Sequence, residues 1–292
     1  MKTHYVSSDK TVRKRVVKHG KIINKPTEGS ICHLNIENID ITPSNYKLDF
    51  LTSSNSEILN GNSNIVVTID ETNCEIDRQI ERAIKWMGEN EIAIITINLP
   101  SSHADNNKDE IKITFKATLT KHERIKYIWE WTPEEKYSTS LRYKQMAVKL
   151  INDNRIKDAF YRFSKAVKLL ITLEPIDDLE LDETLFNNIN KLRTNLYNNM
   201  AMCQLKYNNY DYAIDLCTKV LLRDGNNVKA MYRRGCAYGN LKNIERALND
   251  FQKAVHVEPT NMAAWEKMKI YSELWQLANK RSDDMLKKMF CL

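Results

Sequence analysis

The feature that most constrains this 292-residue chain is a sequence pattern that occurs twice in its C-terminal half, 34 residues apart. Small residues occupy the same places in both copies, at Ala201 and Gly235 and again at Ala213 and Ala247. Small side chains allow two antiparallel helices to approach closely, while larger residues further along fill the groove beside them. The pattern therefore predicts two stacked helical hairpins, of which the second ends at Pro259 because proline cannot continue a helix.

A third copy of the pattern lies upstream, with Ala147 and Ala159 at the two small positions. The distance from Ala159 to Ala213 is 54 residues, so 20 residues, including the acidic stretch EPIDDLELDETL, are inserted between the first and second copies. A 34-residue period with these small residues is typical of tetratricopeptide (TPR) repeats, and three units satisfy the minimum for a stable all-α solenoid. The alternative, three unrelated amphipathic hairpins, does not account for the shared small residues.

The first 122 residues have a different pattern. Five runs alternate between apolar and polar residues or are rich in β-branched residues, and polar turn material separates them. Between the third and fourth runs, Ile76, Ile80, Ile84 and Met87 recur at helical spacing. This order predicts an α+β domain over 1–122, in which one helix covers the concave side of a curved antiparallel sheet. The five runs are TVRKRVVKHG, ICHLNIENIDI, NIVVTID, EIAIITINL and EIKITFKATL.

Residues 123–138 are rich in charge and are expected to link the two halves. Within them, Thr132 offers a capping hydroxyl, and Pro133 followed by two glutamates suits the first turn of a helix. The three TPR repeats are expected over 139–259.

Residues 260–292 carry an apolar stripe and are expected to form a C-terminal capping helix, because the last repeat of a solenoid otherwise exposes its apolar face. The basic end of this segment, LKKMF, is also compatible with a calmodulin or membrane contact. The stripe consists of Trp265, Met268, Leu274 and Leu277.

Composition excludes several classes of protein. The net charge is +6, with 38 acidic residues spread among 44 basic ones, so we expect no nucleic-acid partner. The longest apolar run, IAIITINL, is too short to span a bilayer, and no early segment resembles a secretion signal, so we expect no membrane partner and a location in the cytosol or nucleus. The six cysteines form no CxxC pair and have no suitably spaced histidines, so we expect no metal, no disulfide and no cofactor.

Two segments of the N-terminal half, SSDKTVRKRVVKHGK and EIDRQIERAIKWMGENEIAIITI, resemble the FKBP (FK506-binding) immunophilin domain. The junction IWEWTPEEK and the repeats that follow it resemble the TPR-bearing members of that family. The stretches KLLITLEP, VKAMYRRG, GNLKNIERA and LKKMF resemble a divergent branch of these proteins. The resemblance implies an FKBP-like domain followed by TPR repeats.

The resemblance also shows departures at the pocket that binds a prolyl ring, which the family builds from aromatic side chains. Leu34 stands where the family has a tyrosine, Ile80 stands where it has a tryptophan, and Asp77 replaces an apolar residue of the pocket floor. The later loop, LPSSHADNNKD, contains no aromatic residue, and Phe115 alone keeps an aromatic pocket position. A prolyl ring needs such walls to shed water, so we expect no isomerase activity.

Polar residues on the first helix of each repeat are candidates for a peptide-binding site. They are Lys144 in the first repeat, Asn199 in the second, and Lys229 and Arg233, one turn apart, in the third. Three cations and an amide around one concave surface suit a carboxylate-rich peptide end. By resemblance, these positions match the dicarboxylate clamp of co-chaperones that hold the Glu-Glu-Val-Asp tail of heat-shock protein 90. Val148 departs from that clamp, because many clamps carry asparagine there.

The resemblance implies a non-catalytic co-chaperone that couples heat-shock protein 90 to a client such as a kinase, a receptor or a cell-cycle regulator. In this reading the TPR groove holds the chaperone tail and the FKBP-like domain contacts the client. Two alternatives remain open at this point. One is a prolyl isomerase that its TPR half delivers to clients, and the other is a scaffold whose groove holds a different acidic segment.

Overall fold

The computed structural model describes residues 3–21, 25–42, 56–59, 64–99 and 111–290. The chain divides into two compact units, Met1–Trp131 and Thr132–Leu292. The division falls inside the segment expected to be a linker. The first helix of the second unit begins at Pro133, ahead of the start expected at residue 139, because Thr132 and Glu135 form a reciprocal capping box there.

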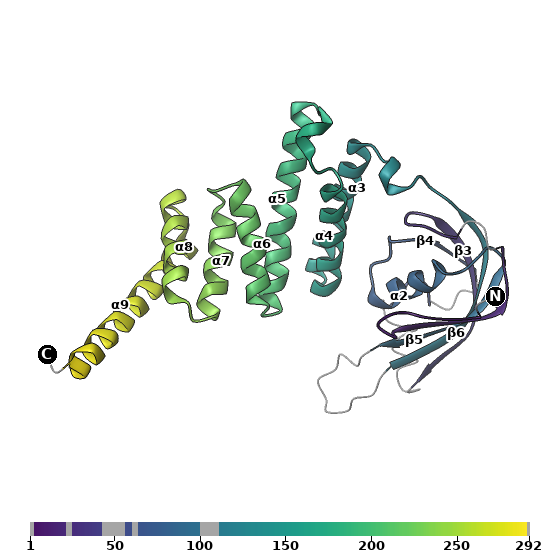
Figure 1. Ribbon diagram of the computed structural model, residues 1–292, viewed down its shortest axis with the longest axis horizontal. Coiled ribbons are helices and arrows are strands. Elements are labelled where there is room, and N and C mark those ends of the chain that lie inside the picture. Colours follow the sequence, from purple (N-terminus) through teal and green to yellow (C-terminus); the bar gives the residue numbers. More distant parts are fainter. Residues whose placement is uncertain (1–2, 22–24, 43–55, 60–63, 100–110, 291–292) are drawn as a thin grey trace. The chain divides into compact units, whose positions relative to one another are not determined.

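A six-stranded antiparallel sheet forms the first unit, in the order β1-β2-β5-β6-β3-β4 (Figure 1). The five runs read from the sequence correspond to β2 through β6. The short edge strand β1 was not predicted, because three residues are too few to show an alternation. The strands are β1 (His4–Val6), β2 (Val12–Lys18), β3 (Ile31–Thr42), β4 (Asn64–Thr68), β5 (Glu91–Leu99) and β6 (Ile111–Glu123).

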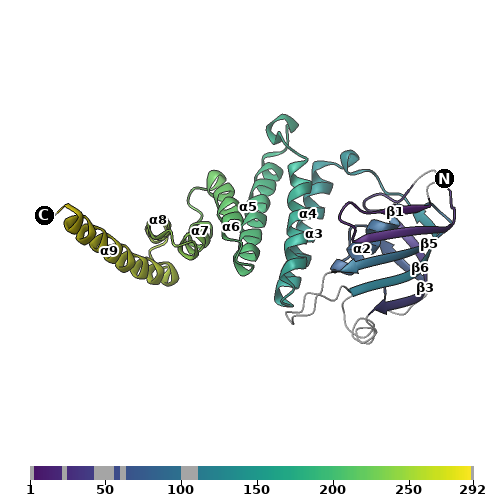
Figure 2. The same cartoon turned by 60° about the horizontal axis from the view of Figure 1, so that its bottom comes forward.

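Helix α2 (Glu75–Ile84) lies across one face of this sheet, as Figure 2 shows. Its predicted apolar face is confirmed, because Ile76, Ile80 and Ile84 are buried and Met87 is buried just after the helix ends. Opposite them, the inward-facing residues of the central strands complete one hydrophobic core. These residues are Ala93, Ile95 and Ile97 of β5, and Ile113, Phe115, Ala117 and Leu119 of β6.

A buried ion pair ties the second strand to the turn between α2 and β5. The Lys14 side chain is 0% exposed, and its Nζ lies 2.6 Å from Glu91 Oε1 and donates to the carbonyl of Trp86 at 2.7 Å. The second carboxylate oxygen of Glu91 accepts from the backbone N–H of Gly88. Burial lowers the pKa of Lys14, and the contact with Glu91 opposes that shift. A buried charge is tolerated only with such partners.

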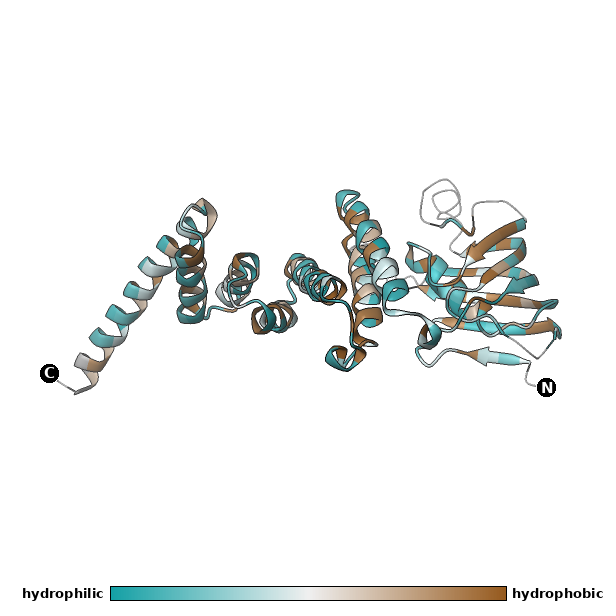
Figure 3. Ribbon diagram, turned by 90° about the horizontal axis from the view of Figure 1, so that it is seen from above, coloured by the Kyte–Doolittle hydropathy of each residue, from teal (hydrophilic) through white to brown (hydrophobic). Residues whose placement is uncertain are grey.

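The second unit consists of three helical hairpins and a final long helix (Figure 1). The small positions read from the sequence are confirmed, because each of those alanines is fully buried at a helix contact. Figure 3 shows polar and apolar residues alternating around these helices. The helices are α3 (Pro133–Asn152), α4 (Ile156–Ile171), α5 (Glu183–Lys206), α6 (Tyr210–Arg223), α7 (Val228–Asn240), α8 (Ile244–Val257) and α9 (Met262–Phe290).

The inserted residues between the first two hairpins form a short 3-10 helix, η3 (Ile176–Leu179), and the first turn of α5. Asp182 caps that turn by accepting a hydrogen bond from the N–H of Thr184. The insertion therefore lengthens the first helix of the second repeat instead of forming a separate loop.

The final helix packs on the third hairpin through an aromatic contact. The rings of Phe251 and Tyr271 lie 5.3 Å apart, and a methyl group on Gly239 would meet the Tyr271 hydroxyl at 1.9 Å. Glycine at 239 thus leaves room for α9, as expected for a capping helix.

A carboxyl group inside the first unit has an unusual environment. Glu81 of α2 is buried, and its Oε1 accepts from the N–H of Thr72 at 3.2 Å. Burial and the nearby charge of Asp70 raise the pKa of Glu81 to about 7. The folded chain therefore keeps a proton at pH values where an exposed glutamate has lost it.

This shift predicts that the first unit loses stability as pH rises from about 4.5 to about 7, because the unfolded state releases the proton earlier. Glu81→Gln keeps the acceptor for Thr72 and cannot ionise. We expect it to remove this slope and to stabilise the unit at pH 8 by on the order of 3 kcal/mol. Urea unfolding of the full chain across this pH range measures the effect, with the exposed Glu57→Gln as the control. A Glu81→Gln profile that keeps the wild-type slope would refute the assignment.

Candidate functional site

The first helices of the three hairpins, α3, α5 and α7, provide the candidate peptide-binding residues. Helix α3 contacts α5, and α5 contacts α7. Lys144 lies on α3, Asn199 lies on α5, and Lys229 and Arg233 lie on α7. The structure thus places the four predicted residues on three neighbouring helices.

Local capping fixes where α7 begins and therefore where its two cations lie. The Asn227 side chain accepts from the N–H of Ala230 at 3.0 Å, which is a standard N-cap bond. Lys229 then falls in the first turn, where its side chain is exposed, and Arg233 follows one turn later. Residues four apart on a helix share a face, so the two cations project to the same side.

Arg233 is anchored at the contact between α5 and α7. Its side chain is half-buried, and Nη1 donates to the backbone carbonyl of Asn198 at 2.6 Å. Burial lowers the pKa of Arg233, although arginine stays charged at neutral pH. A guanidinium has five N–H donors, so this bond fixes the group while leaving donors for a ligand. Arg233 therefore lies beside the turn of α5 that carries Asn199.

The neighbouring Arg234 has a different role. Its Nε and Nη2 each lie 2.8 Å from an oxygen of Asp250, in a two-pronged ion pair that joins α7 to α8. Asp250 is 2% exposed, so this pair holds the third hairpin together internally. Of the two adjacent arginines, only Arg233 faces α5.

The two lysines of the candidate site have no competing acidic partner. Lys144 is half-buried and Lys229 is exposed, and neither forms an ion pair with any residue that the structure describes. Val148, one turn after Lys144, is 40% exposed on the same helix. The ammonium groups are therefore accessible to an anionic ligand, and an apolar side chain occupies the fifth position.

The sequence prediction missed Asn198, the residue before Asn199. Its side chain is buried, and Nδ2 donates to Asn227 Oδ1 at 3.1 Å, which links α5 to the cap of α7. Its Oδ1 has no hydrogen-bond partner among the described residues. The doublet Asn198-Asn199 was visible in the sequence, but only the helix spacing shows that one asparagine supports the site from behind.

A polar hollow of about 560 Å³ adjoins this link. It lies between the N-terminal half of α5 and the turn that joins α6 to α7. Asn227, which caps α7 and bonds to Asn198, also lines the hollow. The other lining residues are Asn190, Lys191, Thr194, Asn195, Arg223 and Asp224.

The predicted pocket positions of the first unit lie inside its core. Leu34 of β3, Ile80 of α2 and Phe115 of β6 are each at most 2% exposed and belong to one hydrophobic cluster. Asp77 is fully buried, and its carboxylate accepts from the Ser56 hydroxyl and from the N–H of Glu57. Aliphatic packing and a structural carboxylate thus occupy the four positions. The loop 100–110 lies outside the described residues.

Metal and membrane sites were also examined in the described part of the chain. No group of three or more His, Cys, Asp or Glu side chains there could hold a metal ion. None of the helices described is both long and apolar enough to cross a bilayer. Burial raises the pKa of the thiols of Cys32 and Cys203 to about 12 and about 11, so these cysteines stay protonated and inert.

Comparison with known families supports the division into two kinds of domain. A family described as "BDBT FKBP like N-terminal" matches residues 5–124. The tetratricopeptide repeat family matches residues 228–261, which comprise the third hairpin and the start of α9.

Similar proteins include the human peptidyl-prolyl cis-trans isomerase FKBP4, which is 27% identical over 224 residues, 75% of this chain and 48% of that protein. The mouse FK506-binding protein-like is 33% identical over 140 residues, 48% of this chain and 37% of that protein. This chain thus spans about half the length, or less, of these curated relatives. The crystal structure of residues 1–211 of CG17282 has a TM-score of 0.57 at 21% identity, over 72% of this chain and 96% of that one, which shows a shared fold.

Proposed function

We propose that this chain, a divergent FKBP-type immunophilin with C-terminal TPR repeats, is a non-catalytic adaptor whose TPR groove binds the acidic C-terminal tail of heat-shock protein 90. The observation that carries this proposal is the fixed guanidinium of Arg233 between α5 and α7, with Lys229 exposed one turn away. Lys144 and Asn199 add a cation and an amide from the two preceding repeats.

The chemistry of these groups suits the end of a Glu-Glu-Val-Asp peptide. A C-terminal aspartate carries two carboxylates close together, and each takes paired donors well. Charge-assisted hydrogen bonds contribute about 1.5 to 3 kcal/mol each, so three cations supply useful affinity. Val148 supplies no donor at the fifth position, which weakens the site without removing it.

The FKBP-like domain is proposed to contact a client protein, such as a kinase, a receptor or a cell-cycle regulator, through its outer surface. Exposed valines support a surface role, because Val6, Val17 and Val66 lie on β1, β2 and β4 at 56%, 58% and 62% exposure. Both edge strands of the sheet, β1 and β4, carry one of them. The adaptor is proposed to act in the cytosol or the nucleus.

We expect Lys229→Ala to weaken binding of a Glu-Glu-Val-Asp peptide to the full chain by about tenfold or more, since it removes a charge-assisted contact. Arg233→Ala should act similarly, and the double change should come close to abolishing binding. Asn199→Ala should also weaken binding, whereas Val148→Asn should strengthen it. Calorimetric titration measures all of these changes, and added salt should weaken the wild type most.

The matched control is Lys253→Ala, which removes an exposed lysine from α8, the outer helix of the same hairpin. It should bind the peptide as the wild type does. If the wild type fails to bind, or if Lys229→Ala and Arg233→Ala bind unchanged, the chaperone-adaptor proposal is wrong. A scaffold for a different acidic segment then becomes the better account.

FKBP4 is named as a peptidyl-prolyl cis-trans isomerase, so the same activity needs a direct test here. We expect no measurable isomerisation of a prolyl peptide in a protease-coupled assay. Leu34 and Ile80 are buried within the core and provide no aromatic wall to desolvate a prolyl ring. An active FKBP domain at the same concentration is the positive control. Catalytic efficiency near that of the control would contradict the prediction.

A further inference from the structure

Helix α9 uses one stripe of its surface to cover the third hairpin. Ala264 is fully buried in a cluster with Met231 and Ala254, Met268 packs against that cluster, and the Tyr271 ring lies against Phe251. The spacing from 264 to 268 to 271 is that of one helix face. The stripe is therefore the docking face of α9 on the solenoid.

The same stripe continues beyond the hairpin. At helical spacing it passes through Trp275, Ala278 and Ser282 to Met285, Leu286 and Met289. The last three are 62%, 49% and 69% exposed. Figure 1 shows the C-terminal half of α9 running on past α8. The face that is buried on the solenoid at one end of α9 is thus uncovered at the other end.

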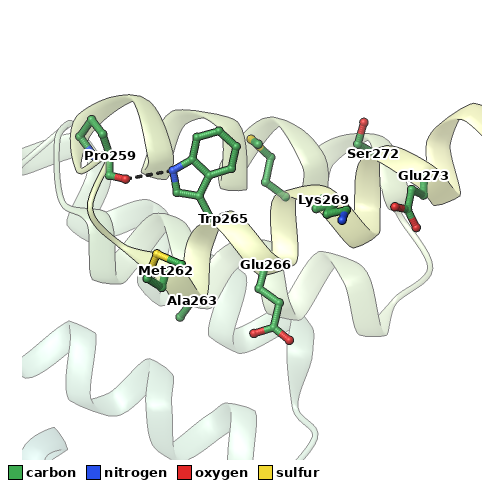
Figure 4. Close-up of a pocket in the computed structure, with 9 residues that line it drawn as sticks. Pro259, Met262, Ala263, Trp265, Glu266, Lys269, Ser272 and Glu273 are labelled. Atoms are coloured by element: carbon green, nitrogen blue, oxygen red, sulfur yellow. Dashed lines mark hydrogen bonds between the residues drawn. The ribbon is translucent and has the colours of Figure 1, made fainter.

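A second apolar surface of α9 is distinct from this stripe. It is a cleft of about 980 Å³ at the start of the helix, on a different face, where Met262 and Trp265 lie beside Pro259 (Figure 4). Trp265 Nε1 donates to the carbonyl of Pro259 at 2.9 Å. Because this cleft lies on the same helix and is also apolar, it provides a matched control surface.

Charged residues flank the exposed stripe in a self-complementary order. Lys280 and Arg281 precede Ser282, Asp283 and Asp284 follow it, and all four charged side chains are exposed. In two antiparallel copies of α9 that cross at Ser282, Lys280 would face Asp283 of the second copy on one flank. Arg281 would face Asp284 of the second copy on the other flank. A twofold axis makes each such pair occur twice.

The apolar residues match under the same pairing. Ala278 meets Leu286 of the second copy, and Trp275 meets Met289 of the second copy, so that small faces large and flat faces flexible. Ser282 lies on the axis, where its small side chain permits close approach. A parallel, in-register pair would instead place like charges opposite each other, which is unfavourable.

We propose that the exposed stripe of α9 binds the same stripe of a second copy of this chain, antiparallel about a twofold axis at Ser282. The balanced charges favour this occupant over a membrane surface, which attracts helices whose polar face is rich in lysine and arginine. One helix per copy buries less than a standard interface of about 1,200 to 2,000 Å². The association is therefore weak, at roughly micromolar concentrations.

Sedimentation equilibrium of the full chain across the micromolar range tests the association. Leu286→Asp combined with Met289→Asp should raise the dissociation constant of the dimer by at least about tenfold, since charges would enter the apolar contact. Met262→Asp, at a site that is 77% exposed in the cleft of the same helix, should leave it unchanged. Wild type that stays monomeric throughout, or equal effects of both changes, would overturn the proposal.

A charge exchange tests the pairing itself. Asp283→Lys with Asp284→Lys makes one stripe wholly basic, and Lys280→Glu with Arg281→Glu makes another wholly acidic. Each variant alone should be monomeric, and an equal mixture of the two should recover the dimer. A mixture that stays monomeric, or single variants that dimerise as the wild type does, would refute the ion pairs.

Cross-linking tests the direction of the helices. In a Cys291→Ser background, Ser282→Cys should form a disulfide-linked dimer on mild oxidation, because the two copies meet at this position. Ala278→Cys should not, because it faces Leu286 of the second copy, whereas a parallel pair would cross-link at both positions. A monomer that binds phosphatidylserine vesicles or calcium-loaded calmodulin through this stripe, without self-association, would replace the proposal with those partners.

Discussion

Close approach between helices is the constraint on which the candidate groove depends. At Gly235 even a methyl group would lie 2.9 Å from the ring of Phe251, and the equivalent Ala201 is fully buried. This approach holds α7 in register with its neighbours, so that the Arg233 guanidinium reaches the Asn198 carbonyl. The smallest residues of the repeat therefore determine where its most important cation lies.

The first unit shows the opposite use of its interior. An immunophilin pocket is open and aromatic, but here Leu34, Ile80 and Phe115 pack inside one core. Asp77 is spent on holding residues 56–57 through two hydrogen bonds. Since these side chains are committed to stability, recognition by this unit is expected from its outer surface. The chemistry of ligand binding is thus concentrated in the second unit.

The sequence predicted the parts of the structure that depend on periodicity. The 34-residue repeat and its small residues identified the three hairpins, and alternation identified five strands, because burial imposes those periods directly. The edge strand β1 was too short to detect, and the extension of α5 into the insertion was not foreseen. Asn198 and the Lys14–Glu91 pair depend on distances between elements remote in sequence, which no local pattern encodes. Helix spacing did, however, separate the groove-facing Arg233 from the structural Arg234.

The central claim is that the groove recognises the free C-terminal carboxylate of an acidic peptide. The most direct measurement compares two labelled peptides, Glu-Glu-Val-Asp and its C-terminal amide, by fluorescence anisotropy with the full chain. The account predicts that the free acid binds and that the amide binds at least about tenfold more weakly, because a charge-assisted contact is lost. Equal binding of the two peptides, or binding of neither, would contradict it.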